Sequence, residues 1–490
     1  MKPRIKKLGT IRDLFNENLP YMIVIAILLL SLAGYIQENF RNLPFQIPLY
    51  YGLAWGPQQL GPRNYLWIFY SILVLIGIIN SVMSMIETRK GNYQISKLYH
   101  YFSFFIIVTG SVFIHDTISS VTLFNLEVPM ILRLIILPML AAGITVLLVT
   151  PLVIKLARRY GFMDDPLAHK HPGMLIKKPT PRAGGLAYYL GIIIPGLVVL
   201  PILSSQKLIG ILIGAAICVL VGLKDDKKDI HPITRLLVQI LTVSIPVLSG
   251  IILLYIPNPF GDAVVLDQYR ITFNFLGDHS VYYYSVLVAM LWMGVTMNFM
   301  SFANGSDGAY AGLVFVASFV IAIVMFQTLD VDPEQAMFIK LAALSAGAAI
   351  GMAYFTWPPQ KLLWGFGATS AGLIIAALSI IGSTKVAVML LVLLIPFFDG
   401  LVAVVRRIRR GQLPFWGDRE HLHHKLLFRL GWNKSKVATF YWASSIMLGV
   451  VGILTSGKVR ALWALTMVGI FFLGIAALNF IGKDKEATVK

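Results

Sequence analysis

The chain has little charge and almost no cysteine. Of its 490 residues only 13% are charged and 57% are hydrophobic, whereas a soluble globular protein carries about 25% charged residues. Its one cysteine, Cys218, stands in an apolar stretch, so an intramolecular disulfide and a cysteine metal site are both excluded. This composition indicates a protein embedded in a membrane, with the lipid bilayer as its first partner.

Acidic residues are scarcer than basic ones, with 23 Asp and Glu against 41 Lys and Arg, which gives a net charge of +18. Such an excess can mark a nucleic-acid protein. Here the basic residues fall in short loops between apolar runs and form no soluble patch. The pattern therefore favours membrane orientation over nucleic-acid binding.

Apolar runs recur along most of the chain, each long enough to cross a bilayer, which takes about 20 residues. We predict an all-α polytopic membrane protein with about 14 transmembrane helices. No small-residue cleavage site follows the first run, residues 19–36, so we expect a retained helix and not a signal peptide. The predicted spans begin near Leu19, Tyr65, Leu98, Pro129, Gly185, Leu208, Leu236, Tyr282, Leu313, Ala336, Gly367, Val386, Val437 and Leu462.

A composition shift near Glu127 separates three N-terminal spans from the remaining eleven. We therefore predict an N-terminal three-helix membrane region of unknown role, residues 1–127, and a second membrane domain, residues 128–490. With the N-terminus inside, most Lys and Arg residues fall in inner loops, which the positive-inside rule favours. Both termini are then cytoplasmic.

The first polar motif in an inner loop ends at Lys178 and continues as Pro179-Thr180-Pro181-Arg182-Ala183-Gly184-Gly185. The two prolines stiffen the chain, and the paired glycines let the backbone approach a ligand or a neighbouring helix. Ordinary positive-inside charge would explain the lysines but not this order. Lys178 and Arg182 are therefore candidate phosphate-binding residues.

The second motif, Gly222-Leu223-Lys224-Asp225-Asp226, closes an apolar run. Adjacent carboxylates are costly unless a cation compensates them, and oxygen ligands of this kind suit Mg²⁺ bound together with substrate phosphates. A solvated charge run is the alternative. A functional role for the Asp225–Asp226 pair is favoured because the other polar motifs fall on the same predicted membrane face.

The third motif runs from Asn298 to Gly308 and contains Asn304 and Asp307 in an Asn-Gly-x-Asp-Gly turn. Such a turn serves equally well as a tight link between helices. Its amide and carboxylate are also suited to hold a nucleobase edge or a metal-bound phosphate.

The fourth motif combines Asp399, inside an apolar run, with Arg419, His421, His423 and His424. Ionisable residues at membrane depth are usually functional, although Asp399 could simply pair with Arg406. Three histidines in four residues suggest zinc, but they offer no closed set of four ligands. A clamp for a diphosphate explains them better.

In this order the four motifs resemble the polyprenyl-phosphate N-acetylhexosamine-1-phosphate transferases, which include the phospho-N-acetylmuramoyl-pentapeptide transferases. The resemblance covers residues 129 to about 481. It implies transfer of an (N-acetyl)hexosamine 1-phosphate from a UDP-sugar to polyprenyl (undecaprenyl) phosphate, with release of UMP. It also implies a bacterial inner-membrane enzyme with Mg²⁺, or Mn²⁺, as cofactor, and a homodimer is an open possibility.

The resemblance also implies roles for the candidate residues. Catalytic residues would be Asp225, Asp226, Asp307, His423 and His424, and the three aspartates among them would hold the metal. Substrate-binding residues would be Lys178, Arg182, Asn298, Asn304, Asp399, Arg419 and His421.

Two positions where the family carries aspartate are neutral here, namely Asn304 and Phe366. A catalytically silent relative that binds prenyl-linked glycan lipids, or scaffolds a glycan assembly complex, is therefore the alternative to an enzyme. The aspartate pair and the histidines argue against a mere scaffold, which would not need them. A transporter is the weaker alternative, because no repeat with broken helices at mid-membrane depth is apparent.

Overall fold

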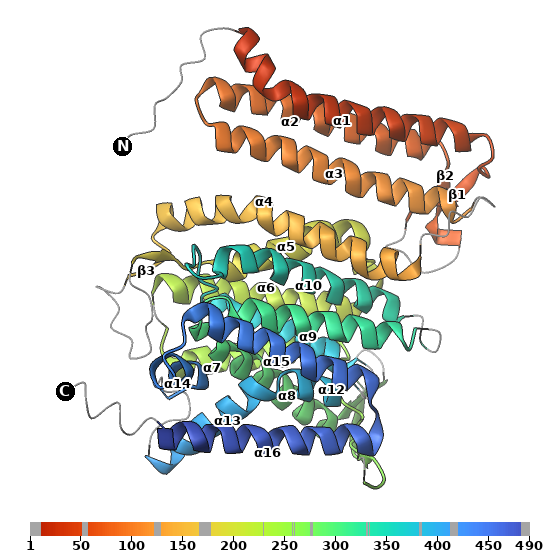
Figure 1. Ribbon diagram of the computed structural model, residues 1–490. Coiled ribbons are helices and arrows are strands. Elements are labelled where there is room, and N and C mark those ends of the chain that lie inside the picture. Colours follow the sequence, from red (N-terminus) through yellow and green to blue (C-terminus); the bar gives the residue numbers. More distant parts are fainter. Residues whose placement is uncertain are drawn as a thin grey trace. The chain divides into compact units, whose positions relative to one another are not determined.

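The computed structural model describes residues 11–50, 57–121, 129–165, 178–228, 230–256, 258, 260–274, 278–329, 332, 334–381, 385–411 and 420–481. The chain forms two compact units (Figure 1). One comprises residues 1–133 and 194–204, and the other comprises residues 134–193 and 205–490. The predicted boundary near Glu127 lies outside the described residues.

The first unit contains helices α1 (Ile11–Phe40), α2 (Tyr65–Arg89) and α3 (Tyr93–Ser119), together with a short antiparallel pair of strands, β1 (Gln46–Pro48) and β2 (Leu60–Pro62). Its core is aliphatic, with Ile36 and Leu66 fully buried. At one end the helices share polar contacts, in which the carboxamide oxygen of Asn18 lies 2.8 Å from both Ser84 Oγ and His100 Nε2. Interhelical hydrogen bonds of this kind hold membrane helices in register.

The second unit is a helical bundle that also carries three short hairpins. Its helices are α4 (Leu137–Tyr160), α5 (Gly184–Val199), α6 (Gln206–Lys227), α7 (Pro232–Leu248), α8 (Tyr283–Phe302), α9 (Ala309–Phe326), α10 (Gln335–Thr356), α11 (Thr369–Ile380), α12 (Lys385–Val392), α13 (Leu394–Arg409), α14 (Leu422–Phe428), α15 (Lys434–Leu454) and α16 (Gly457–Ile481). The hairpins are β3 (Met163–Asp164) with β4 (Thr180–Pro181), β5 (Tyr255–Ile256) with β6 (Val264–Val265), and β7 (Arg270–Asn274) with β8 (Asp278–Tyr282).

Each of the fourteen predicted spans coincides with a helix, which confirms the all-α polytopic class. Among the described residues, nine helices are long and apolar enough to cross a bilayer. The span predicted to begin near Val386 is two helices, α12 and α13, that meet at an angle of 79°. Three further apolar helices, which include α5 and α7, are shorter than a full span, so the number of crossings stays a prediction.

Small residues bring the central helices close together. A Cβ atom on Gly347 of α10 would lie 1.8 Å from the carbonyl oxygen of Met139 on α4, and one on Gly351 would lie 2.8 Å from that of Gly143. Backbones this close leave no room for side chains between them. Among the described helices that are long enough to cross a bilayer, α9 and α10 are the most buried.

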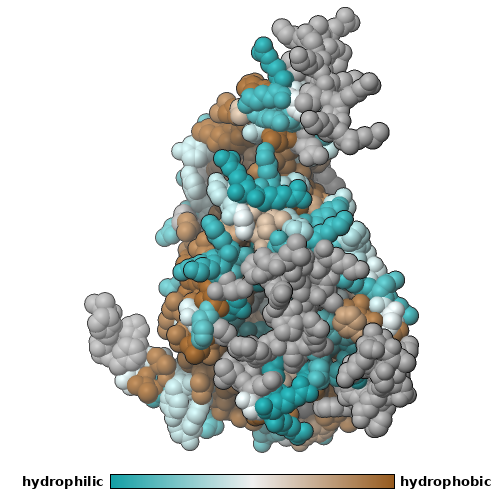
Figure 2. Space-filling view, turned by 90° about the vertical axis from the view of Figure 1, so that its left-hand side faces the viewer, coloured by the Kyte–Doolittle hydropathy of each residue, from teal (hydrophilic) through white to brown (hydrophobic). Residues whose placement is uncertain are grey.

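The polar loops of the second unit meet at one end of the bundle, where β3 and α14 lie (Figure 1). The β4 strand leads into a backbone ladder with residues 363–364: Leu363 donates its N–H to Pro181, and Gly184 and Gly185 donate theirs to Leu363 and Trp364. Hydrophilic residues gather on this end between hydrophobic flanks (Figure 2). The bundle thus carries a polar rim at the end of its apolar helices.

Three glycines from distant parts of the chain pack together beneath this rim. Cβ atoms on Gly185 and Gly222 would each approach backbone atoms of Gly367 to 2.5 Å, closer than real Cβ contacts come. Gly185 opens α5, Gly222 is in the last turns of α6, and Gly367 lies in the 3₁₀ turn η5 (Phe366–Ala368). The absence of side chains here lets η5 reach the end of α6.

We predict that Gly222→Ala lowers the stability of the protein, although alanine is the better helix former. Overpacking against the backbone of Gly367 should cost about 1–3 kcal/mol, more than the gain in helix propensity of about 1 kcal/mol. The measurement is the thermal unfolding midpoint of the purified protein in detergent. Gly294→Ala in α8 is the matched control, because nothing lies within 4 Å of its added Cβ. Equal midpoints for the two variants would contradict the packing argument.

Candidate functional site

The centre of the polar rim is the carboxylate pair Asp225 and Asp226, in the last turn of α6. Only 1% and 5% of their surfaces are exposed. Helix α6 is apolar from Leu208 to Leu223, so its final turn brings the two carboxylates against the loops that cover it. A buried carboxylate requires a compensating cation or hydrogen bonds.

Two arginines supply this compensation. Arg182, just after β4, places its Nε 2.8 Å from Asp226 Oδ1 and its Nη2 3.8 Å from Asp225 Oδ2. Arg235, in the first turn of α7, places its Nε 2.6 Å from Asp225 Oδ1. The first of these contacts confirms that the first two sequence motifs meet in space.

The backbone of the 363–368 segment completes the surroundings of Asp226. The N–H of Phe366 donates to Asp226 Oδ1 over 2.9 Å. Gly365 adopts φ = +67°, and a Cβ atom there would lie 2.1 Å from Asp226 Oδ2. Glycine is required at this position, both for its backbone conformation and for the space that the carboxylate takes.

The third motif lies against the same segment. Asn304 Nδ2 donates to the carbonyl oxygen of Gly365 over 3.3 Å. Asp307, three residues further along the turn, is 7% exposed, and both of its carboxylate oxygens lie 3.0 Å from Lys434 Nζ. Burial raises the pKa of Asp307, and the ammonium group of Lys434 opposes that rise.

The fourth motif is built around Asp399. Its Oδ2 lies 2.9 Å from His421 Nδ1, and its Oδ1 accepts from the N–H of Leu422, so Asp399 holds the first turn of α14. His421 and His423 stack with ring centroids 5.8 Å apart. His423 in turn lies against Gly305, where an added Cβ would be 2.7 Å from its Nε2. The histidines are therefore continuous with the Asn304 turn.

Asp399 is fully engaged in positioning His421 and α14, and Arg406 forms an ion pair with Glu420 over 3.5 Å. A role for Asp399 in binding substrate directly stays a prediction. The catalytic role expected of His424 also stays a prediction. This residue is 4% exposed and has its ring centroid 4.2 Å from that of His423.

Two predicted site residues, Asn298 and Lys178, have no contact with this cluster among the described residues, and a third lies outside them. Asn298 exchanges hydrogen bonds of 3.1 Å with Gln239, which ties α8 to α7. Lys178 is exposed at the start of the loop that leads to Arg182. Arg419 lies outside the described residues. Their roles in binding substrate stay predictions.

Sequence reasoning did not assign roles to Arg235 and Lys434. Arg235 had a local signal, because His231-Pro232 starts a helix and so turns its first residues back toward α6. Lys434 had none, because it lies 127 residues from Asp307. Lys425, 6% exposed in α14, was also missed, and burial lowers the pKa of its ammonium group.

The arrangement places partly exposed cations around two fixed carboxylates, which is suited to binding anions. Arg182, Arg235 and Lys434 have side chains that are 23%, 30% and 29% exposed, so their free surface can meet a ligand while they hold the aspartates. No group of three or more His, Cys, Asp or Glu side chains able to hold a metal occurs within the described part of the chain. A resident metal held by protein ligands alone does not fit the described residues.

Comparison with known proteins identifies relatives of one kind. Residues 208–383 match the family described as Glycosyl transferase family 4, a region that contains Asp225, Asp226 and Asp307 and ends before Asp399. The chain is 24% identical over 300 residues to the probable undecaprenyl-phosphate N-acetylglucosaminyl 1-phosphate transferase of Bacillus subtilis, covering 60% of this chain and 77% of that protein.

Two further relatives are similarly distant. The decaprenyl-phosphate N-acetylglucosaminephosphotransferase of Mycobacterium leprae is 28% identical over 342 residues, covering 63% of this chain and 81% of that protein. The phospho-N-acetylmuramoyl-pentapeptide-transferase of Moorella thermoacetica is 26% identical over 331 residues, covering 64% of this chain and 96% of that protein.

We predict that Lys434→Met destabilises the protein in a pH-dependent way. Because burial raises the folded-state pKa of Asp307 above its unfolded value, the stability from this group is present at low pH and is lost as pH rises through the folded pKa. Without Lys434 the folded pKa rises further, so the variant should lose more stability relative to the wild type at pH 8 than at pH 5. The loss should be about 1–3 kcal/mol, below the range for fully buried pairs because Lys434 is partly exposed.

The measurement is the thermal midpoint of both proteins at the two pH values. Lys436→Met on the same helix is the control, because Lys436 lies over the Trp432 ring at 4.6 Å and is not paired with Asp307. A midpoint difference between Lys434→Met and wild type that is the same at pH 5 and pH 8 would show that Asp307 is not the titrating partner.

Proposed function

We propose that the chain is a divergent member of the polyprenyl-phosphate N-acetylhexosamine-1-phosphate transferase family and that it transfers a hexosamine 1-phosphate from a UDP-sugar to a polyprenyl phosphate. The products are polyprenyl-diphosphate-sugar and UMP. The observation that carries the proposal is the buried Asp225–Asp226 pair held by Arg182 and Arg235 at the end of an apolar helix. That position suits a reaction between a lipid and a soluble nucleotide.

In this reaction an oxygen of the acceptor phosphate attacks the sugar-linked phosphorus, and the bond from that phosphorus to UMP breaks. Several phosphate charges must then be brought together, and catalysis depends on positioning and on neutralising them. The exposed parts of Arg182 and Arg235 are suited to the phosphates. The aspartates fix the direction of both guanidinium groups, and one of them is suited to accept the proton of the acceptor phosphate.

Magnesium fits this site only as an ion shared with the substrate. Mg²⁺ commonly binds one or two carboxylates together with substrate phosphates and waters. Asp225 Oδ2 is buried and accepts no hydrogen bond among the described residues, and Arg182 Nη2 lies 3.8 Å from it, so an ion bound there would replace that contact. Asp225 and Asp226 would hold the ion, which would supply charge neutralisation of the phosphates when bound. Asp307 would first have to release Lys434.

The turn at Asn304 and the histidines of α14 suit the donor nucleotide and its sugar. Asn304 is half-buried beside the segment that contacts Asp226, and His423 packs against the same turn. An amide and imidazole groups beside the aspartate pair can hold a base edge and a diphosphate. This proposal gives the third and fourth motifs one shared ligand.

The protein is a multi-pass membrane protein, and we place its reaction on the cytoplasmic face of a bacterial inner membrane. The support is the excess of Lys and Arg in the loops of the polar end, together with the similarity to bacterial transferases that act on polyprenyl phosphates. Both termini are then cytoplasmic. The product would initiate a cell-envelope glycan.

The proposal is tested by incubating the purified protein with Mg²⁺, polyprenyl phosphate and a panel of radiolabelled UDP-sugars. We expect a labelled lipid product, and Asp225→Asn or Asp226→Asn should lower the rate at least about 100-fold, the range that loss of a group that stabilises transition-state charge produces. Asp267→Asn, in the loop between β6 and β7, is the control for a carboxylate away from the site. If no labelled lipid forms with any UDP-sugar of the panel, the proposal is wrong.

The two neutral positions separate an enzyme from a silent relative. A native enzyme already acts with Asn304 and Phe366, so Asn304→Asp with Phe366→Asp should not create an activity that the wild type lacks. If only this double variant forms lipid product, the chain is a silent relative whose site has lost its acidic groups.

A further inference from the structure

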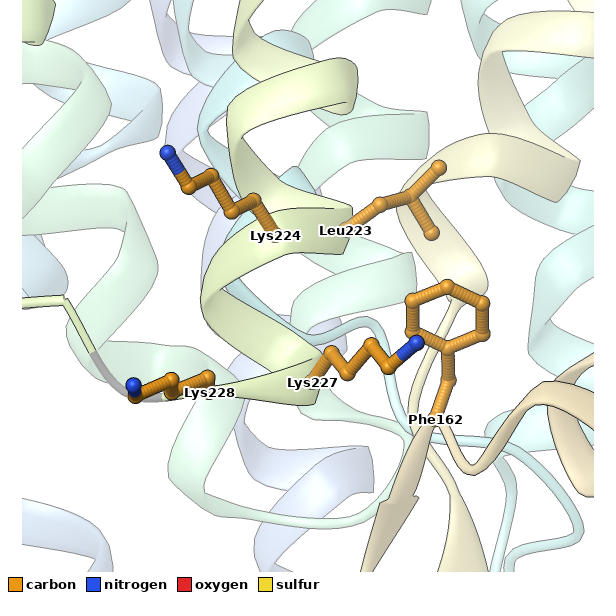
Figure 3. Close-up of a pocket in the computed structure, with 5 residues that line it drawn as sticks. All are labelled: Phe162, Leu223, Lys224, Lys227 and Lys228. Atoms are coloured by element: carbon orange, nitrogen blue, oxygen red, sulfur yellow. The ribbon is translucent and has the colours of Figure 1, made fainter.

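A cleft lies outside the aspartate pair, on the other side of α6. It has a volume of about 540 Å³ and is lined by Phe162, Leu223, Lys224, Lys227 and Lys228 (Figure 3). Lys227 extends toward the Phe162 ring, with its Nζ 5.8 Å from the ring centroid, while Lys224 and Lys228 extend away from that ring. Phe162 and Leu223 therefore form the apolar floor of the cleft, and three lysines line the rest of it.

The cleft is at the end of the lipid-exposed stripe of α6. Ile213 and Leu220 are 47% and 66% exposed, and Lys224 and Lys227 continue the same stripe at the helix end. At 3.6 residues per turn these four side chains share one face, whereas Asp225 and Asp226 project from the opposite face. One helix thus separates a basic surface that meets the membrane from the buried carboxylates.

The three lysines carry more charge than their surroundings neutralise. All are exposed, and none forms an ion pair or hydrogen bond with a carboxylate in the described part of the chain. A helix C-terminus favours nearby cations, which accounts for single lysines here. Like charges three and four residues apart repel, and an anion bound between them would remove that cost.

The cleft is linked to the site through one backbone hydrogen bond. The N–H of Arg182 donates to the carbonyl oxygen of Phe162 over 2.9 Å, and the side chain of Arg182 contacts Asp226. A ligand over the Phe162 ring would therefore be next to the residue that orders the aspartate pair. The ligand that fits both ends has an anionic head and an apolar chain.

We propose that this cleft captures the acceptor lipid before reaction: Lys224, Lys227 and Lys228 hold the phosphate monoester head of a polyprenyl phosphate, and Phe162 and Leu223 contact its first isoprene units. The proposal rests on the proposed function and adds to it an entry site outside the aspartate pair. The lipid reaches the head position along the exposed stripe of α6. It then passes Phe162 to reach Arg182.

The test is a binding experiment on the full-length protein in nanodiscs of phosphatidylcholine, titrated with undecaprenyl phosphate. The variant Lys224→Gln/Lys227→Gln/Lys228→Gln should bind it at least tenfold more weakly than the wild type. Phe162→Ala should also weaken binding, because it removes the apolar floor. Lys207→Gln is the matched control, since this lysine stands at the other end of the same helix and should leave the affinity unchanged.

Two outcomes would overturn the inference. One is equal affinity of the triple variant and the wild type. The other is a loss that is the same for phosphatidylglycerol as for undecaprenyl phosphate, which would show general attraction to anionic lipids only.

Transferase kinetics separate this inference from the proposed function. If both hold, the triple variant has a raised KM for polyprenyl phosphate and an unchanged KM for the UDP-sugar. An active wild type with unchanged KM in the triple variant overturns the capture site alone. If the wild type transfers no sugar, and the triple variant still binds undecaprenyl phosphate more weakly than the wild type does, the proposed function alone is overturned.

Discussion

The constraint on which this structure depends is the burial of two adjacent carboxylates at the end of a membrane helix. Removing such charges from water is costly, and the loss is offset only when cations and hydrogen bonds meet them with good geometry. Arg182 contributes most to this compensation, because it contacts both Asp225 and Asp226. The β3–β4 hairpin, the ladder with residues 363–364 and the glycine contacts all serve to bring Arg182 and the N–H of Phe366 to the pair.

The sequence predicted the helices well because a membrane span has a strong local signal, in which each apolar run must satisfy its own backbone hydrogen bonds. It also predicted that the polar motifs would share one end, since alternate loops lie on the same side. It did not predict the 79° break after Leu393, although Pro396, in the first turn of α13, has no N–H to donate to Val392 and so favours a kink there. Nor could it predict Lys434 as the partner of Asp307, because that contact depends on how α9 and α15 pack.

Phe366 stands where the transferases that this sequence resembles carry an aspartate, and the structure gives that difference a physical meaning. Instead of a carboxylate side chain, the position offers a backbone N–H to Asp226 and an aromatic ring 5.4 Å from the Arg235 guanidinium. A cation over a ring face is attracted by the ring quadrupole. Arg235 is therefore held in place without another negative charge.

Gly365 makes the position of the Asp226 carboxylate depend on the space that a side chain would fill. Its missing side chain is the space that one oxygen of Asp226 occupies, and its left-handed backbone turns the next N–H toward the other oxygen. A single methyl group at this position would therefore displace the carboxylate while leaving every charge of the protein in place. The position of the Asp226 carboxylate therefore depends on Gly365, a residue 139 positions away in the sequence that has no side-chain functional group.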